Sequence, residues 1–250
     1  MKTSVGIVGC GFIGGALKKW IEEHNPEINL LISDPYKGYN DDLSNSDIVF
    51  VSIHIPTEED GTQDLTLLKE IICKLPDKPI FIRTTILPGT SERLSKECNR
   101  KVHFMPEFLT ERTAYQDFCS QPMIFTAEIE LLKKIFVNKK FITMSSLEAE
   151  LTKYTHNVFG ALKVTYFNGI YNLCEKMEAN YRKIQEGILL SGYINAPHTM
   201  VPGPDGKFGY GGKCFPKDVN AFCKMTEGLP IYGLLKELKP LNIEFRGEDK

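Results

Sequence analysis

The segment SVGIVGCGFIG at residues 4–14 decides the fold of this chain. Its first half, residues 4–8, has the composition of a buried strand, and the glycines that follow lead into a helical pattern. Gly9, Gly11 and Gly14 have the spacing G-x-G-x-x-G. Between a strand and a helix, these glycines allow a tight turn, close approach of the backbone to a pyrophosphate, and packing of helix on strand. The helix N-terminus then stabilises the anion, so the segment predicts a dinucleotide site.

An acidic residue follows the last glycine of this motif at a distance of twenty residues. Asp34 ends the next apolar run, where its carboxylate can accept hydrogen bonds from the adenosine ribose hydroxyls and repel a 2′-phosphate. We therefore predict NAD as the cofactor, bound by Gly9, Gly11, Phe12, Ile13, Gly14 and Asp34. The alternative interpretation is a glycine turn with a surface aspartate.

Short apolar runs alternate with helical stretches through the first part of the chain. The predicted strands are Ser4–Val8, Asn29–Ser33, Ile48–Ile53, Pro79–Thr84, Val102–Met105, Pro122–Thr126 and Phe141–Met144. The predicted helices are Ile13–His24, Leu65–Leu75, Gly89–Asn99 and Glu128–Val137. This alternation predicts an α/β fold with a doubly wound, mostly parallel sheet of the Rossmann type.

The pattern changes near Ser145. The elements expected after it are a long proline-free helix, a second helix, a Gly/Pro-rich loop and a further helix: Leu147 to Met177, Tyr181 to Ser191, Pro197 to Cys214, and from Pro216 onward. We therefore expect two domains, an NAD-binding domain at residues 1–145 and a small helical domain at residues 146–250.

The composition is that of a soluble globular chain, with 42% hydrophobic and 25% charged residues. The chain has 30 Lys and Arg against 32 Asp and Glu, which gives a net charge of −2. No excess of positive charge therefore favours binding to nucleic acid or to an anionic membrane. No stretch approaches the ~18 apolar residues of a membrane span. The glycines and charges of the N-terminal segment fit a strand–turn–helix better than a signal peptide.

Seven cysteines are present, an odd number, and no C-x-x-C or His/Cys cluster has metal-site spacing. This usage is typical of a reducing compartment. We therefore expect a cytoplasmic protein without a metal, with one reactive thiol and the other cysteines as small core residues.

The most informative motif is FGYGGKCFPKD at residues 208–218. Cys214 follows a glycine-rich loop and directly precedes a predicted helix, with Lys213 and Lys217 beside it. Helix N-termini and cations favour the thiolate. Asp218 lies four residues on, which is the same helical face if the helix begins at the cysteine. A thiolate near a nicotinamide can oxidise an aldehyde through a thiohemiacetal to a thioester, whereas the alternative is a packed cysteine beside a surface loop.

Three further motifs carry polar groups. Lys153 and Asn157 share one face of the long helix, where they could hold a substrate oxygen or form a solvent-facing polar stripe. Glu107 and Glu111 in PEFLTE follow a strand end, as either a base and a cofactor contact or an acidic first turn. Thr84 and Thr85 in RTTILPGT follow another strand end, where their hydroxyls could face the nicotinamide or the substrate, whereas the alternative is a helix cap by Thr90.

Taken in this order, the motifs resemble those of the UDP-glucose/GDP-mannose dehydrogenase family over nearly the whole chain. The combination of T-T-x-x-P-G-T, P-E-F-L-x-E, K-x-x-x-N and F-G-Y-G-G-x-C-F-P-K-D is specific. The resemblance implies a four-electron, NAD-dependent oxidation of a nucleotide sugar to a carboxylate, with UDP-glucose as the expected substrate and polysaccharide synthesis as the use of the product. It also implies a homodimer formed through the long helix.

The resemblance assigns roles residue by residue. For catalysis it implies Cys214 as nucleophile, Lys153 and Asn157 at the oxyanion, Asp218 with the attacking water, Glu107 as acid and base, and Thr85 beside that water. It adds Thr57, Thr85 and Glu111 to the cofactor site. For the substrate it implies Glu107, Lys153, Asn157, Gly203, Lys207, Phe208 and Gly211.

Several positions depart from the family pattern. The chain ends at Lys250, so we expect it to lack the family's second nucleotide-binding domain. The family's Arg-Ile-Gly before the substrate loop is Tyr-Ile-Asn at residues 193–195, a threonine is replaced by Ile55, and an arginine by Thr110. These departures concern substrate identity more than NAD binding or thiol chemistry.

Two other functions remain open from the sequence. A β-hydroxyacid or 6-phosphogluconate-type dehydrogenase would also use a Lys with an Asn four residues on, but would transfer one hydride and need no thiol. A non-catalytic NAD-binding homologue would bind the cofactor only.

Overall fold

The computed structural model describes residues 2–247. By internal contacts the chain forms two compact units. Unit 1 contains the chain up to Pro56 and then Gln63–Lys153, and unit 2 contains Thr57–Thr62 and the chain from Tyr154 onward. Residue 145, after which we place the domain boundary, directly precedes the long helix, whose first turns belong to unit 1 by contacts.

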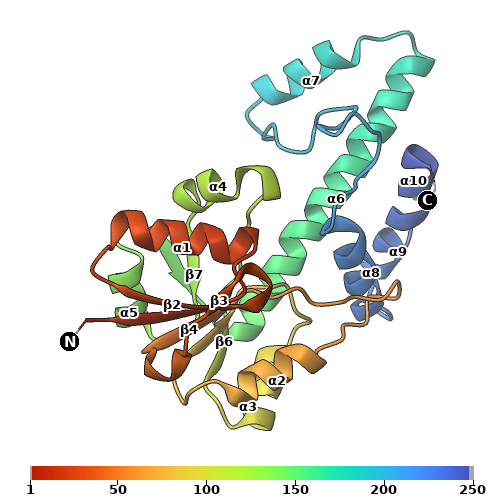
Figure 1. The fold of residues 1–250 in the computed structure, drawn as a ribbon. Helices are drawn as coiled ribbons and strands as arrows, with labels where there is room; N and C mark the ends of the chain where they lie inside the picture. The colour runs from red at the N-terminus through yellow and green to blue at the C-terminus, as the bar shows by residue number, and fades with distance from the viewer. Residues whose placement is uncertain (1, 248–250) are drawn as a thin grey trace. The chain divides into compact units, whose positions relative to one another are not determined.

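Unit 1 is built on a six-stranded sheet with the strand order β3-β2-β1-β4-β5-β6 (Figure 1). All neighbouring strands are parallel except β3, which pairs antiparallel with β2 at the edge. The strands are β1 Ser4–Val8, β2 Asn29–Asp34, β3 Tyr39–Asn40, β4 Ile48–Val51, β5 Ile80–Ile82 and β6 Val102–Phe104. Two more strands, β7 Met123–Phe125 and β8 Phe141–Thr143, form a separate parallel pair. The prediction of a mostly parallel α/β sheet is confirmed.

Helices cover both faces of this sheet, with α1 and α4 on one side and α2 and α3 on the other (Figure 1). On β4, Val49 and Val51 point to the α2–α3 side, and Ile48 and Phe50 to the α1 side. Every residue of β4 is therefore buried, which explains why its sequence is apolar throughout instead of alternating. The helices of this unit are α1 Phe12–His24, α2 Thr66–Lys74, α3 Thr90–Cys98, α4 Ala114–Ser120 and α5 Ile129–Ile135.

Unit 2 is helical. The long helix α6, Ser146–Lys176, enters it at Tyr154, and one apolar core joins α6 to α8–α10 while another joins it to α7. The remaining helices are α7 Tyr181–Leu190, α8 Phe215–Met225, α9 Tyr232–Leu235 and α10 Leu238–Arg246. The sequence predicted α7 and the start of α8, but not α9 and α10. Across residues 2–247 no helix combines the length and the apolar composition that crossing a membrane requires.

Two of the cysteines that we expected to be small core residues are bonded to each other. Cys73 and Cys98 form a disulfide that links α2 to α3, with their Cα atoms 4.7 Å apart. The two helices pack on the same face of the sheet, a proximity that a separation of 25 residues in sequence does not reveal. Cys119 is exposed, so it is not the small core residue that we expected, and Cys214, which the sequence singles out as the reactive thiol, is exposed as well.

Candidate active site

The glycine motif forms the turn between β1 and α1. Gly9 has φ +80°, and a Cβ there would lie 2.6 Å from the Ser52 carbonyl oxygen. A Cβ at Gly14 would overlap the Gly9 carbonyl oxygen, so with any side chain at residue 14 the helix α1 could not pack this closely on the turn. Gly11 caps α1 and has open space where a Cβ would stand. The three positions therefore meet the steric requirements of a pyrophosphate loop, and Phe12 and Ile13 form the first turn of α1 without an acidic side chain.

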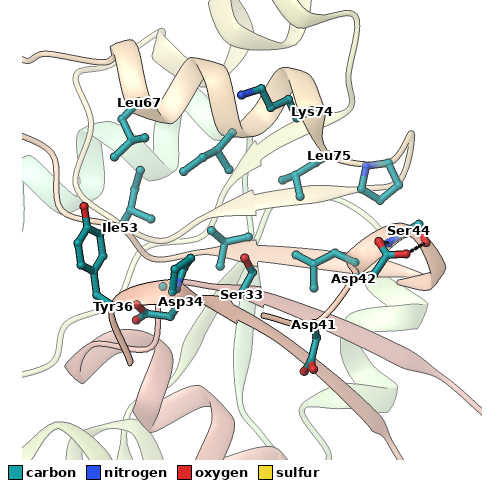
Figure 2. Close-up of a pocket in the computed structure, with 16 residues that line it drawn as sticks. Ser33, Asp34, Tyr36, Asp41, Asp42, Ser44, Ile53, Leu67, Lys74 and Leu75 are labelled. Atoms are coloured by element: carbon teal, nitrogen blue, oxygen red, sulfur yellow. Dashed lines mark hydrogen bonds between the residues drawn. The ribbon is translucent and has the colours of Figure 1, made fainter. Parts of the chain in front are cut away.

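A cavity of about 600 Å³ adjoins this turn, between the ends of β1 and β2 and the helix α2. In Figure 2, Asp34 and Tyr36 line one end of it, below Ile53 and Leu67. The Asp34 carboxylate accepts a hydrogen bond of 2.7 Å from the backbone N–H of Cys10, which ties the acid to the glycine turn. An acid beside an anion-binding turn and an apolar wall from α2 suit the ribose and adenine of a dinucleotide, so the residues present fit NAD.

The other predicted cofactor contacts lie at different places in the fold. Thr85 follows β5 and is buried, and its carbonyl oxygen accepts from the Gln63 side chain at 3.1 Å. Glu111 begins an exposed 3₁₀ turn, Glu111–Thr113. Thr57 belongs to unit 2.

Glu107 and Lys153 form a buried ion pair inside unit 1. Their side chains are 5% and 4% exposed, and Lys153 Nζ lies 3.0 Å from Glu107 Oε1. Lys153 also donates to the Glu107 carbonyl oxygen, and Glu107 Oε2 accepts from the Leu109 N–H at 2.6 Å. Burial of both ions is costly unless each is hydrogen-bonded, and here each is. The pair presents an ammonium able to stabilise a developing negative oxygen, beside a carboxylate able to accept a proton.

Sequence reasoning missed a second buried cation that acts on Glu107. Arg83, at the end of β5, is 1% exposed, and burial lowers its pKa to about 10 while the charge of Glu107 opposes that shift. Its guanidinium lies 5.2 Å from the centre of the Phe118 ring, and Nε and Nη1 have no hydrogen-bond partner among residues 2–247. The motif RTTILPGT contained the residue, but only its position in the fold shows that it is buried.

Asn157 and Asp218 come together inside unit 2. Asp218 is 1% exposed, and its Oδ2 accepts from Asn157 Nδ2 at 2.6 Å while Oδ1 lies 2.5 Å from Lys217 Nζ. Asn157 Oδ1 is 3.0 Å from His156 Nδ1. Both carboxylate oxygens of Asp218 are therefore held, which fixes the orientation of a group suited to binding a water or hydroxyl.

Cys214 is the exposed N-cap residue of α8, so the helix begins where the sequence predicted. The N–H of Asp218 donates to the Cys214 carbonyl oxygen at 3.1 Å, which places Asp218 one helical turn beyond the thiol. The next side chain, Phe215, packs on Gly160 of α6, where a Cβ would lie 2.7 Å from the ring. Gly160 therefore allows the start of α8 to approach α6, a role for which the sequence held no signal.

The glycine-rich loop before Cys214 is held by α6 and α10. Asn242 bonds both the N–H and the carbonyl oxygen of Tyr210, at 2.6 and 3.0 Å, and Asn168 accepts from the Gly209 N–H at 3.0 Å. Arg246 donates to the carbonyl oxygen of Phe208, and a Cβ at Gly211 would overlap its guanidinium. None of the three polar residues belongs to a recognisable motif.

Two of the predicted substrate residues of this loop, Gly203 and Lys207, form a turn, and Phe208 and Gly211 follow it. The Gly203 N–H donates to the Lys207 carbonyl oxygen at 2.8 Å, which closes the turn, and the Phe208 ring contacts that of Tyr171. Unit 1 therefore brings together Glu107 and Lys153, and unit 2 brings together Asn157, Asp218 and the start of α8. Lys153 and Asn157 are one turn apart on α6.

Comparison with known proteins covers both units. Residues 16–137 match the NAD-binding domain of the UDP-glucose/GDP-mannose dehydrogenase family, and residues 147–242 match its central domain. The chain is 31% identical over 209 residues to UDP-glucose 6-dehydrogenase of Rickettsia felis, covering 76% of this chain and 46% of that protein. It is 32% identical over 214 residues to GDP-mannose 6-dehydrogenase of Pseudomonas aeruginosa, covering 75% and 48%. The chain thus spans about half the length of the curated relatives it matches.

Solved structures show the same fold. A UDP-glucose dehydrogenase of Pyrobaculum islandicum superposes with a TM-score of 0.79 at 22% identity, over 98% of this chain and 68% of that chain. A UDP-D-ManNAc dehydrogenase of Pyrococcus horikoshii superposes with a TM-score of 0.74 at 19% identity, over 97% and 69%.

Proposed function

The chain belongs to the UDP-glucose/GDP-mannose dehydrogenase family, and we propose that it oxidises the primary alcohol of a nucleotide sugar, UDP-glucose first, to a carboxylate in two NAD-dependent steps. The observation that carries this proposal is the start of α8. Cys214 is exposed at the N-cap, and the buried, doubly held Asp218 follows one turn later. A single-hydride dehydrogenase has no use for an exposed thiol at a helix N-terminus.

NAD would be held by the glycine turn and Asp34, and it would supply the oxidising power for both steps as a hydride acceptor. Between them, the Cys214 thiolate adds to the carbonyl carbon of the aldehyde, forming a C–S bond and a tetrahedral thiohemiacetal. The second oxidation converts this adduct to a thioester, and water then cleaves the C–S bond to release the acid and the free thiol. Atoms balance with one water consumed per sugar.

The other polar groups assist the thiol chemistry. The Lys153 ammonium donates to the negative oxygen of the tetrahedral species, and Asn157 adds an amide donor. Glu107 takes the proton of the attacking water, which Thr85 helps to hold, and Asp218 keeps Asn157 in position. The hydrogen bonds of Glu107 to Lys153 and of Asp218 to Asn157 support these roles. The turn at residues 203–207, with Phe208 and Gly211, contacts the nucleotide sugar.

The test is the number of NADH formed per sugar consumed, followed by absorbance with purified protein, NAD and UDP-glucose. We expect about two NADH per sugar, loss of acid formation in Cys214→Ser, and unchanged turnover in Cys119→Ser, which replaces another exposed thiol. One NADH per sugar, retained in Cys214→Ser, would point to a single-hydride dehydrogenase. NAD binding without turnover of UDP-glucose, GDP-mannose or UDP-N-acetyl sugars would leave a non-catalytic homologue.

We also propose a homodimer formed through α6. Phe159, Tyr166 and Leu173 are 63%, 57% and 49% exposed and recur every seven residues, so they form one apolar stripe on the helix. An exposed stripe of large apolar side chains favours a partner helix. We also propose a cytoplasmic location, because Cys214 acts as a reduced thiol, although the Cys73–Cys98 disulfide is of a kind that is rare in that compartment.

A further inference from the structure

One short loop in the middle of the unit 1 sequence makes its contacts with unit 2. Residues 57–62 follow β4 and precede α2, yet by contacts they belong to unit 2. The Glu58 N–H donates to the Thr62 carbonyl oxygen at 2.8 Å, and the Gly61 N–H donates to the Glu58 carbonyl oxygen at 3.0 Å. The loop is therefore closed by its own backbone, with residues 59–61 at its tip.

The tip of this loop is bound to α8. The Asn220 amide donates to the Glu59 carbonyl oxygen at 2.8 Å, and Lys224 Nζ lies 2.6 Å from Asp60 Oδ2. Gly61 is buried with φ +86°, and a Cβ there would overlap the Cα of Ala221. Because Gly61 has no side chain, the loop backbone lies directly on the α8 backbone.

The two stems of the loop lead to the cavity beside Asp34. Ile53, four residues before the loop, lines that cavity, and so do Leu67 and Ile71 of α2, which begins four residues after it (Figure 2). A ligand in this cavity therefore touches the chain on both sides of the loop. At the other end, α8 carries Cys214 at its N-cap, seven residues before Ala221.

We propose that the loop at residues 57–62 transmits occupancy of the cavity beside Asp34 to the start of α8, so that binding of the adenosine half of the dinucleotide changes the reactivity of Cys214. The proposal rests on the proposed roles of the dinucleotide and of Cys214, but not on the identity of the sugar. Gly61, Asn220 and Asp60 are positioning residues in this coupling, since they hold α8 without reaching the thiol.

The experiment measures alkylation of Cys214 by iodoacetamide, with and without saturating ADP-ribose. ADP-ribose lacks the nicotinamide and so separates coupling from direct shielding by that ring. Labelling is followed by mass spectrometry of the Cys214 peptide, with exposed Cys119 of unit 1 as the internal reference. In the wild-type protein we expect ADP-ribose to change the Cys214 rate constant by at least about fivefold, the lower end of measured couplings, and to leave Cys119 unchanged.

Gly61→Ala is the variant that breaks the contact, and Gly228→Ala is its matched control. Gly228 has nearly the same φ, +82°, but open space around a Cβ. We expect the ADP-ribose effect to disappear in Gly61→Ala and to persist in Gly228→Ala, with saturation checked in each by calorimetry. Asn220→Ala, which removes one hydrogen bond to the tip and leaves the backbone unstrained, should reduce the effect in the same direction if Gly61→Ala does not fold.

An equal ADP-ribose effect in wild type, Gly61→Ala and Asn220→Ala would overturn the proposal, and so would the absence of any effect in wild type. The NADH count decides the proposed function separately. A protein that forms two NADH per sugar but shows no coupling refutes the role of the loop alone, whereas coupling without turnover refutes the oxidation alone.

Discussion

Three interior carboxylates are each held by more than one donor. Glu107 accepts from Lys153 and a backbone N–H, and Asp218 accepts from Asn157 and Lys217. Glu150 of α6 accepts from the N–H of Gly89 and from the N–H and hydroxyl of Ser91, at 2.6 to 2.9 Å. Multiple donors offset the desolvation of each charge, so these groups are fixed in orientation as well as in place.

Glu150 predicts a pH dependence of stability. Burial raises the pKa of Glu150, although its hydrogen bonds with Ser91 and Gly89 oppose the shift. A carboxyl group with a higher pKa in the folded state stabilises the fold when protonated, and this contribution is lost as the pH rises through the raised pKa. The free energy of unfolding of wild type minus that of Glu150→Gln should therefore fall as the pH rises above the ordinary pKa of a glutamate, about 4.3, by at most about 1.4 kcal/mol per pH unit, in urea titrations.

Glu148→Gln provides the control, two residues earlier on the exposed side of the same helix. Hydrogen bonds from the N–H and hydroxyl of Ser145 lower the pKa of Glu148, so its contribution is present at neutral pH and lost as the pH falls. The wild-type-minus-variant difference should thus rise with pH. The same sign of slope for both variants would contradict our account of Glu150.

At the scale of elements, helix ends and helix faces do the positioning. The start of α8 holds Cys214, α10 holds the glycine-rich loop through Asn242, and the first half of α6 supplies Lys153 and Asn157. From Phe159 onward, α6 instead presents the apolar stripe at Phe159, Tyr166 and Leu173 to solvent. One helix therefore carries both polar site residues and a surface suited to a second copy.

The stripe predicts the effect of a charge on self-association. Tyr166→Glu would place an unpaired carboxylate in the helix contact, and we expect it to weaken the dimer at least about 100-fold, or about 2.7 kcal/mol. Asn172→Glu adds the same charge at an exposed position of α6 outside the stripe, and it should leave the dimer intact. Light scattering after size-exclusion chromatography gives the masses. A wild-type monomer, or a dimer that persists in Tyr166→Glu, would refute the α6 interface.

At the scale of the whole molecule, stability is linked to the ligand that unit 1 binds. Any ligand that binds only the folded protein raises its free energy of unfolding according to its concentration relative to Kd. The cavity beside Asp34 lies between β2 and α2, elements of the central sheet and of one of its covering layers. A ligand bound there should therefore raise the free energy of unfolding of the protein and not only reduce local mobility.

NAD at one hundred times its Kd should raise the free energy of unfolding by about 2.7 kcal/mol, and NADP at the same concentration should raise it less. The reason is repulsion between the Asp34 carboxylate and the 2′-phosphate. Asp34→Asn removes the charge but keeps an acceptor for the Cys10 N–H, so it should narrow the difference between the two cofactors. Asp42 also lines the cavity, and Asp42→Asn should leave the difference between NAD and NADP unchanged. Equal stabilisation of wild type by both cofactors, measured by urea unfolding, would contradict this assignment.

Much of unit 1 could be predicted because its signals are local. Continuous apolar runs identified the seven strands β1, β2 and β4 to β8, and the glycine spacing located the turn into α1. The short edge strand β3, residues 39–40, has too few residues to show a pattern. In unit 2 the proline-free stretch predicted α6, and the position of Cys214 before Pro216 predicted the start of α8.

The sequence by itself determined which residues share a helix, strand or turn, because those relations depend on periods of two or 3.6 residues along the chain. It could place Lys153 and Asn157 one turn apart, but not pair them with Glu107 and Asp218, which are 46 and 61 residues distant. Those pairs, the burial of Arg83, the link between Cys73 and Cys98 and the contact of Gly61 with α8 were decided only by the tertiary structure. Each depends on packing between segments remote in sequence, for which no local period exists.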